Sequence, residues 1–268
     1  LDISQEYLQV VQNPQYGYGK NLNPCVDCKI FMLTQARKYA EKMGAHFIFT
    51  GEVIGQRPKS QHRQSLDIIE KKSGLQGRLL RPLSARIMGI SEAEKKGWVS
   101  RDQLLALNGR DRTPQLELAK KFGIQDYQTP SGGCLLTESG YCQKLKDIKD
   151  HTDLFDVSTI LLLQQGRYFR HDKSVIMVGK NKEQNNALRT LQKPDDYLVK
   201  VKDYPGPLTL IRGKKSEGVI ERAAQITARY AKVSTAESVK VLYGSHLQEA
   251  ISVCPLLERD IEALHITL

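Results

Sequence analysis

Three cysteines stand at positions where their sulfurs could share one metal ion or cluster. Cys25 and Cys28 are separated by two residues, a spacing that lets both sulfurs converge, and Cys134 follows much later in a glycine-rich turn. A helix predicted over residues 29–43 comes directly after the pair, and its amino terminus favours the charged thiolates. Three cysteines from two loops predict a [4Fe–4S] cluster with one iron left open.

Other interpretations of these cysteines stay open. Cys25 and Cys28 fit a redox-active pair, and a zinc ion held with a fourth ligand such as His62 is a further alternative. A single CxxC motif is also found as two buried thiols or as a chance match. The chain has five cysteines, an odd number that argues against a disulfide framework. The first residues, Leu1-Asp2-Ile3-Ser4, lack the basic start and the apolar run of a signal peptide, so we expect a cytoplasmic protein.

Helix and strand patterns alternate in the region that must position the cysteines. Apolar spacing predicts helices over residues 29–43 and 61–72 and short strands over 46–49 and 78–83. This alternation is typical of an α/β fold with a parallel sheet, which places its ligands at the carboxyl ends of the strands. The turn that begins at Thr50 is therefore a candidate binding loop.

A second, smaller α+β region follows residue 150. A β-hairpin is predicted over residues 166–179, with strands at 197–202, 208–212 and 238–243 and a helix at 217–231. We expect two domains, residues 1–150 and 151–268.

The charge balance favours a polyanionic partner. Forty Lys and Arg residues against thirty Asp and Glu residues give a formal charge of +10, and basic side chains bind phosphates with release of counterions. In the predicted hairpin, basic residues alternate with Tyr168 and Phe169, an arrangement that suits RNA. A hairpin with one solvated face is an equally good interpretation. The candidate RNA contacts here are Arg167, Arg170, Lys173, Lys180 and Lys182.

Several segments resemble PP-loop tRNA thiolation enzymes of the MnmA/ThiI type. The segment Asn23-Pro24-Cys25-Val26-Asp27-Cys28 looks like their NPxxxC motif, and residues 50–61 are similar to the TGxxxGQxxSQ segment of ThiI-like sulfurtransferases. Residues 80–85 resemble their RPL segment, and Cys134 lies where such enzymes carry a second catalytic cysteine. Residues 154–190 look like the NFACT-R (DUF814) RNA-associated domain.

The resemblance implies an ATP-dependent tRNA sulfurtransferase with a partial PP-loop ATPase (adenine nucleotide alpha hydrolase-like) domain. ATP with Mg²⁺ would adenylate a uridine carbonyl oxygen, and sulfur would displace AMP. Cys25, Cys28 and Cys134 would be the catalytic and cluster-binding residues. In the alternative mechanism with a persulfide, Cys134 would carry the sulfur and Cys28 would resolve the disulfide. Implied nucleotide contacts are Thr50, Gly51, Glu52, Gly55 and Gln56, and implied RNA contacts in this region are Arg57, Lys59 and Arg81.

One departure from the family concerns the phosphate-binding loop. The SGGxDS motif that holds the ATP pyrophosphate is absent, since Ser131-Gly132-Gly133 continues as Cys134-Leu135-Leu136. Three explanations fit this absence: the loop was lost with an upstream segment, a partner supplies it, or the chain no longer uses ATP. The start without Met and the immediate arrival of the later motifs favour the first, so we expect that the first βαβ segment with this loop is missing from the front of the chain.

The expected partners are tRNA and a sulfur donor, either a cysteine desulfurase or free sulfide. No membrane contact is expected, and a homodimer is one assembly that the sequence allows. Two further functions compete with thiolation. One is a non-catalytic RNA-binding protein whose CxxC motif holds zinc, and the other is an ATP pyrophosphatase that acts on a small molecule.

Overall fold

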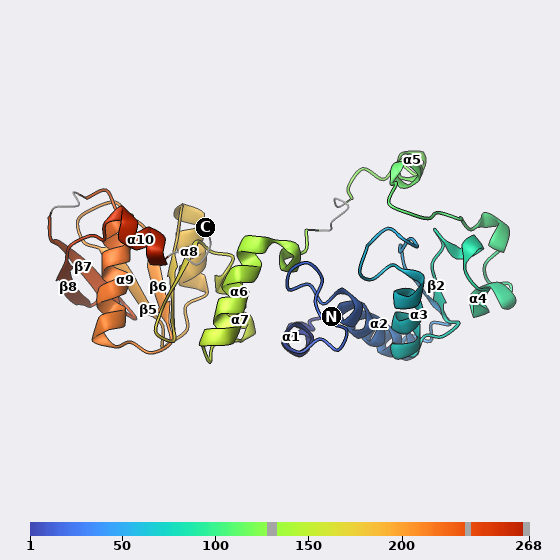
Figure 1. Ribbon diagram of the computed structural model, residues 1–268, viewed down its shortest axis with the longest axis horizontal. Helices are drawn as coiled ribbons and strands as arrows, with labels where there is room; N and C mark the ends of the chain where they lie inside the picture. Colours follow the sequence, from blue (N-terminus) through green and yellow to red (C-terminus); the bar gives the residue numbers. More distant parts are fainter. Residues whose placement is uncertain (128–132, 234–236, 265–268) are drawn as a thin grey trace. The chain divides into compact units, whose positions relative to one another are not determined.

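The chain folds into two compact units. The computed structural model describes residues 1–127, 133–233 and 237–264 (Figure 1). The front unit is Leu1–Thr137 and the back unit is Glu138–Leu268. The division therefore precedes the predicted boundary at residue 150. The reason is helix α6 (Ser139–His151), whose Leu145 and Ile148 are buried and whose Asp147 accepts a hydrogen bond from Tyr168 of the back unit.

Helices outnumber strands in the front unit. Strands β1 and β2 pair in parallel, with helix α3 between them in the sequence, so the predicted βαβ order is present. Each of these strands has only two residues, and nothing in this unit establishes a PP-loop ATPase domain. The elements are α1 (Ser4–Gln12), α2 (Cys25–Lys42), β1 (Ile48–Phe49), α3 (Arg63–Lys72), β2 (Leu79–Leu80), η1 (Ala85–Ile87), α4 (Glu92–Lys95), η2 (Arg101–Gln103), α5 (Thr113–Lys121) and η3 (Leu135–Thr137).

A small apolar core holds the front unit together. Leu33 of α2 and Ile69 of α3 pack with Leu75 and Leu79, and Ile48 of β1 lies against them. These residues recur at helical spacing on α2 and α3, which is why the two helices bury one face each against the short strands. The front unit is therefore a mixed α/β body with a sheet much smaller than the sequence predicted.

The back unit is built on a six-stranded antiparallel sheet with the order β3-β4-β6-β5-β7-β8. The predicted hairpin and the three predicted strands are present, whereas the last strand was not predicted. The elements are α6, α7 (Val157–Leu162), β3 (Arg167–His171), β4 (Ser174–Val178), α8 (Lys182–Thr190), β5 (Tyr197–Val201), β6 (Thr209–Arg212), α9 (Glu217–Arg229), β7 (Val239–Gly244), β8 (Glu249–Val253) and α10 (Glu258–Leu264).

Helices cover both faces of this sheet. Alternate strand residues such as Phe169, Ile176 and Ile211 share an apolar core with the buried side of α9, which crosses the sheet in Figure 1. Residues of opposite orientation face α6 and α7, because Tyr168 bonds to α6 and Arg212 bonds to α7. Since both faces are covered, the strands are apolar along nearly their whole length.

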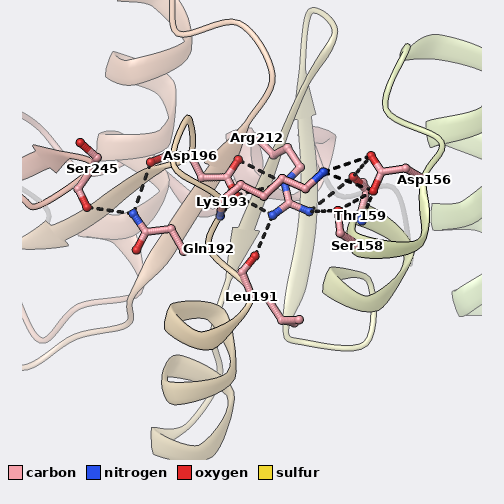
Figure 2. A network of polar contacts seen from close by, with 9 residues as sticks. All are labelled: Asp156, Ser158, Thr159, Leu191, Gln192, Lys193, Asp196, Arg212 and Ser245. Atoms are coloured by element: carbon pink, nitrogen blue, oxygen red, sulfur yellow. Dashed lines mark hydrogen bonds and ion pairs between the residues drawn. The ribbon is translucent and has the colours of Figure 1, made fainter.

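A buried ion pair joins β6, α7 and the loop after α8. The Arg212 guanidinium donates to both carboxylate oxygens of Asp196, to the Leu191 carbonyl and to Ser158 (Figure 2). Arg212 and Asp196 are both 2% exposed, so the pair is satisfied inside the protein. Asp156 caps α7 by accepting from the Thr159 N–H at 3.0 Å. The network ties β6 to α7 and to the loop after α8.

Within the described part of the chain, every helix is too short or too polar to cross a bilayer.

Candidate nucleic-acid interface

A basic pocket of about 350 Å³ lies at one edge of the back unit. Its walls come from the start of β3, the turn between β4 and α8, the loop before β6 and the chain after α9. Four cations line it, and no acidic residue is found among its described lining residues. These cations are Arg167, Lys180, Lys182 and Lys232. We call this cavity the basic pocket.

The walls of the basic pocket are held by backbone contacts. The Gly179 N–H donates to the Leu208 carbonyl at 3.0 Å, and the Leu208 N–H donates to the Asn185 side chain at 3.0 Å. A side chain at Gly179 would meet the Asn185 amide oxygen at 2.1 Å, so this approach requires glycine. The Lys232 N–H donates to the Pro205 carbonyl at 3.1 Å. The cations therefore project from a fixed frame.

Arg167 is held against an aromatic ring. Its guanidinium carbon lies 4.2 Å from the centroid of the Tyr230 ring, which is a cation–π contact. Both side chains are partly buried and both line the pocket. This contact presents a positive charge and a flat surface in the same place.

The electric field around the pocket is positive. Burial lowers the pKa of Lys144, which donates to the Gly166 carbonyl at 3.2 Å, and the charge of Lys180 lowers that pKa further. Among the described residues, the side-chain nitrogens of Lys180, Lys182 and Lys232 have no hydrogen bond or ion pair. Clustered positive charges that have no partner within the protein attract an anion from solution.

The structure separates the predicted hairpin residues into two groups. Arg167, Lys180 and Lys182 line the basic pocket. Arg170 instead pairs with Asp147 at 2.8 Å, and Lys173 pairs with Asp153 at 2.9 Å. Asp147 is largely buried, so the charge of Arg170 is matched inside the protein, which argues against its predicted role in RNA binding. Lys173 and Asp153 form a surface pair whose side chains are 70% and 82% exposed, so the RNA contact at Lys173 stays a prediction.

The predicted stacking role of the hairpin aromatics is wrong. Tyr168 and Phe169 are almost completely buried, Tyr168 at the interface with α6 and Phe169 in the core beneath α9. The aromatic residue at the pocket is Tyr230, which we did not predict, and Lys232 was also missed. Tyrosine and lysine close together after a helix end are the same kind of signal as the hairpin pattern, and that signal could have identified them.

The predicted RNA contacts of the front unit are mostly engaged elsewhere. The Arg81 guanidinium is 2% exposed and donates to Glu52 at 3.2 Å and to Glu70 at 2.8 Å. It cannot reach a phosphate in this conformation, so its assignment is corrected to a buried structural pair. Lys59 donates to the Tyr18 carbonyl at 2.7 Å. Arg57 is exposed in the same loop, and its role stays a prediction.

The predicted nucleotide loop is built around the same buried pair. Thr50 donates to Glu52, which is 2% exposed and ion-paired with Arg81, so Glu52 faces the protein interior. Gln56 donates to Gln115 at 2.7 Å. Gly55 has a φ of +77°, which explains the glycine by backbone geometry, and Gly51 is exposed. The binding of ATP with Mg²⁺ stays a prediction.

The predicted cysteines gather near the start of α2. Asn23 donates to the Cys25 sulfur at 3.1 Å, and Asn21 donates to the carbonyl of Thr137, close to Cys134, at 2.6 Å. Burial raises the pKa of the Cys28 thiol; a hydrogen bond with Tyr7 and the charge of Lys29 oppose this, and the charges of Cys134 and Cys25 add to it. The raised pKa disfavours the thiolate of Cys28, whereas the sequence predicted that the helix amino terminus would favour it.

The cysteine arrangement does not fit a metal site as it stands. Across the described ranges, no three His, Cys, Asp or Glu side chains are arranged so that they could hold a metal ion. The Cys28 sulfur instead contacts the Met32 sulfur at 3.7 Å. The [4Fe–4S] cluster and the zinc alternative with His62 therefore stay predictions, and no chemical step is derived from them. Cys142 is buried in α6, whereas Cys254 is exposed.

A known family model matches part of the back unit. Residues 166–264 match the family model of the NFACT protein RNA binding domain. This region contains all four cations of the basic pocket and the Tyr230 ring. It also supports the expected RNA-associated character of residues 151–268.

The predicted kinship of the front unit is wrong. No PP-loop or tRNA thiolation family accompanies the match to the back unit, so the similarity of short segments such as residues 23–28 does not reflect membership of the MnmA/ThiI type. No curated protein matches the chain.

A solved structure aligns over most of the chain. It is the C-terminal part of the fibronectin/fibrinogen-binding protein from Streptococcus suis, with 15% identity, a TM-score of 0.35 and coverage of 90% of both chains.

Proposed function

We propose that this protein binds RNA and that the basic pocket of the back unit contacts RNA phosphates. The observation that carries the proposal is the set of four cations around one pocket without an acidic neighbour among its described lining residues. The pocket lies within the residues that match an RNA-binding domain. The predicted partner, tRNA, is one of the RNAs to be tested.

The physical basis is charge that the protein has not neutralised. A phosphate that enters the pocket meets Lys180, Lys182 and Lys232. Their ammonium groups can bind it without first breaking an ion pair within the protein. Each such contact also releases condensed counterions from the RNA, so affinity falls as salt rises. Arg167 adds a planar group that can donate two parallel hydrogen bonds to a phosphate.

Replacement of both lysines at the β4–α8 turn tests the proposal. In the full chain, Lys180→Gln with Lys182→Gln should weaken binding to a short single-stranded RNA and to tRNA by about tenfold or more. The slope of log affinity against log salt should fall by about 1.4 on the single strand, since each lost phosphate contact removes about 0.7. Fluorescence anisotropy over a salt series measures both quantities.

The matched control uses two lysines outside the pocket. Lys200 and Lys202 are exposed, have the same spacing and belong to the same unit. Lys200→Gln with Lys202→Gln should change affinity by no more than about twofold, because neither lysine lines the pocket and an exposed charge outside it is screened by salt. Equal losses from both double variants, or no RNA binding by the unaltered chain, would overturn the proposal.

A further inference from the structure

We propose that the basic pocket holds one unpaired nucleotide of a single-stranded RNA segment. The base stacks on the Arg167–Tyr230 pair, and its phosphates lie against Lys180, Lys182 and Lys232. This inference rests on the proposed function and adds the form of RNA that is bound.

The first argument is the shape of the site. A cavity of about 350 Å³ is concave, and its size lies in the range of about 300–1,000 Å³ typical of small-ligand pockets. The phosphates of an A-form duplex lie on a convex surface and its bases are stacked inside, so duplex RNA is read across its shallow groove rather than in a pocket. Only a nucleotide released from a helix can enter this cavity.

The second argument is the flat surface inside the positive field. Proteins that bind single strands stack bases on aromatic rings or on arginine planes and hold the backbone with cations. Tyr230 and Arg167 form such a surface with 4.2 Å between the guanidinium carbon and the ring centroid. The Tyr230 ring is also fixed from below by Phe169, whose centroid is 6.4 Å away. The platform is therefore in place before RNA arrives.

The third argument is a polar group beside the platform. Asn185 lines the pocket, and its amide oxygen already accepts a hydrogen bond from the Leu208 N–H. Its Nδ2 group then remains to donate to an acceptor on a base edge or to a 2′-hydroxyl. A donor, a stacking surface and cations in one cavity match the three parts of a nucleotide.

The test compares one sequence as a single strand and as a duplex. The unaltered full chain should bind the single strand at least about tenfold more tightly than the duplex. Tyr230→Leu should weaken binding to the single strand by at least about fivefold and leave the weaker duplex binding within about twofold. Tyr230→Phe keeps the ring and should bind as the unaltered chain does.

Two further variants keep the test decisive. Tyr243→Leu is the matched control, because Tyr243 is a partly buried tyrosine of the same unit that packs against Tyr197 and does not line the pocket. It should leave RNA binding unchanged. If Tyr230→Leu does not fold, Arg167→Lys serves instead, because it keeps the positive charge and removes the planar guanidinium. It should bind the single strand more weakly, with an unchanged slope of log affinity against log salt.

The outcomes separate this inference from the proposed function. Equal affinity for single strand and duplex, with equal losses in Tyr230→Leu, would overturn the unpaired-nucleotide pocket and leave the phosphate contacts standing. An abasic single strand that binds as tightly as the intact one would also overturn it. A chain that binds neither RNA would overturn the proposed function itself.

Discussion

Cations of the front unit and cations of the basic pocket are the same residue types with opposite surroundings. Arg81 is enclosed by Glu52 and Glu70, and Lys59 is bonded to a backbone carbonyl. Lys180 and Lys182 have exposed side chains at a pocket whose described lining lacks carboxylates. The difference teaches that a basic residue is available to RNA only where the protein has not supplied its acceptor.

This comparison predicts a separation of effects. Loss of a buried, paired cation should lower the stability of its own unit and leave RNA affinity unchanged, because its charge is compensated internally. Loss of a pocket cation should lower RNA affinity and leave stability nearly unchanged, since exposed side chains away from packing contribute little to folding.

The largest effect is expected for Arg81→Met. This change removes the guanidinium that pairs with both Glu52 and Glu70 and leaves only Lys29, 3.7 Å away, as an ion-pair partner of the buried Glu52. Removal of one member of a buried ion pair costs about 3–5 kcal/mol of unfolding free energy. Trp98 is the single tryptophan of the chain and lies in the front unit. Its fluorescence during urea denaturation reports the stability of that unit.

Glu41→Gln is the control for Arg81→Met. It removes an exposed pair with Arg37 on the surface of α2, and such pairs contribute only about 0–1 kcal/mol. RNA affinity of Arg81→Met should stay within about twofold of the unaltered chain. A large loss of RNA affinity in the folded variant would contradict the separation of the two kinds of cation.

An intermediate effect is expected within one strand. Arg167 and Arg170 both belong to β3, yet Arg167 lines the pocket whereas Arg170 pairs with Asp147. Arg167→Gln should weaken RNA binding by about tenfold, equivalent to about 1.4 kcal/mol. Arg170→Gln should change it by no more than about twofold. Anisotropy titrations of both variants at one salt concentration measure the two RNA affinities. Equal losses of affinity would contradict the distinction between the pocket arginine and the paired arginine.

The smallest effect concerns pH. Burial alone would raise the pKa of Glu94, but hydrogen bonds from Ser91 and the pair with Arg101 outweigh it and hold the pKa below its ordinary value. A lowered folded-state pKa gives stability that is present above the unfolded value of about 4.3 and is lost as pH falls through the folded value. The loss should be about 1 kcal/mol.

Comparison with Glu94→Gln isolates this contribution. The amide does not titrate in this range, so the variant should lose less stability than the unaltered chain between about pH 5 and pH 3. Trp98 fluorescence in urea at several pH values measures the difference. RNA binding at neutral pH should be equal in both proteins, because Glu94 lies in the front unit. Parallel pH profiles would show that this capping pair does not contribute.

Local patterns predicted much of the fold and part of the site. The β3–β4 hairpin and the helix α9 follow from spacing and turn residues alone. The same patterns suggested Tyr168 and Phe169 as stacking residues, although both are buried. A strand with two covered faces has no solvent side, and sequence alternation cannot show that a second layer of helices lies there.

The sequence by itself determined the positive charge, the helices and strands that have strong periodic signals, and three of the four pocket cations. Only the tertiary structure decided which cations are free to bind: Arg170 meets Asp147 from α6, whereas Arg167 meets Tyr230 from the end of α9. Local propensity acts within a few residues, but the partner of a charge comes from wherever the chain folds back. For that reason the spacing of Arg and Lys residues predicted an RNA surface, and the packing of distant elements determined where on the back unit it lies.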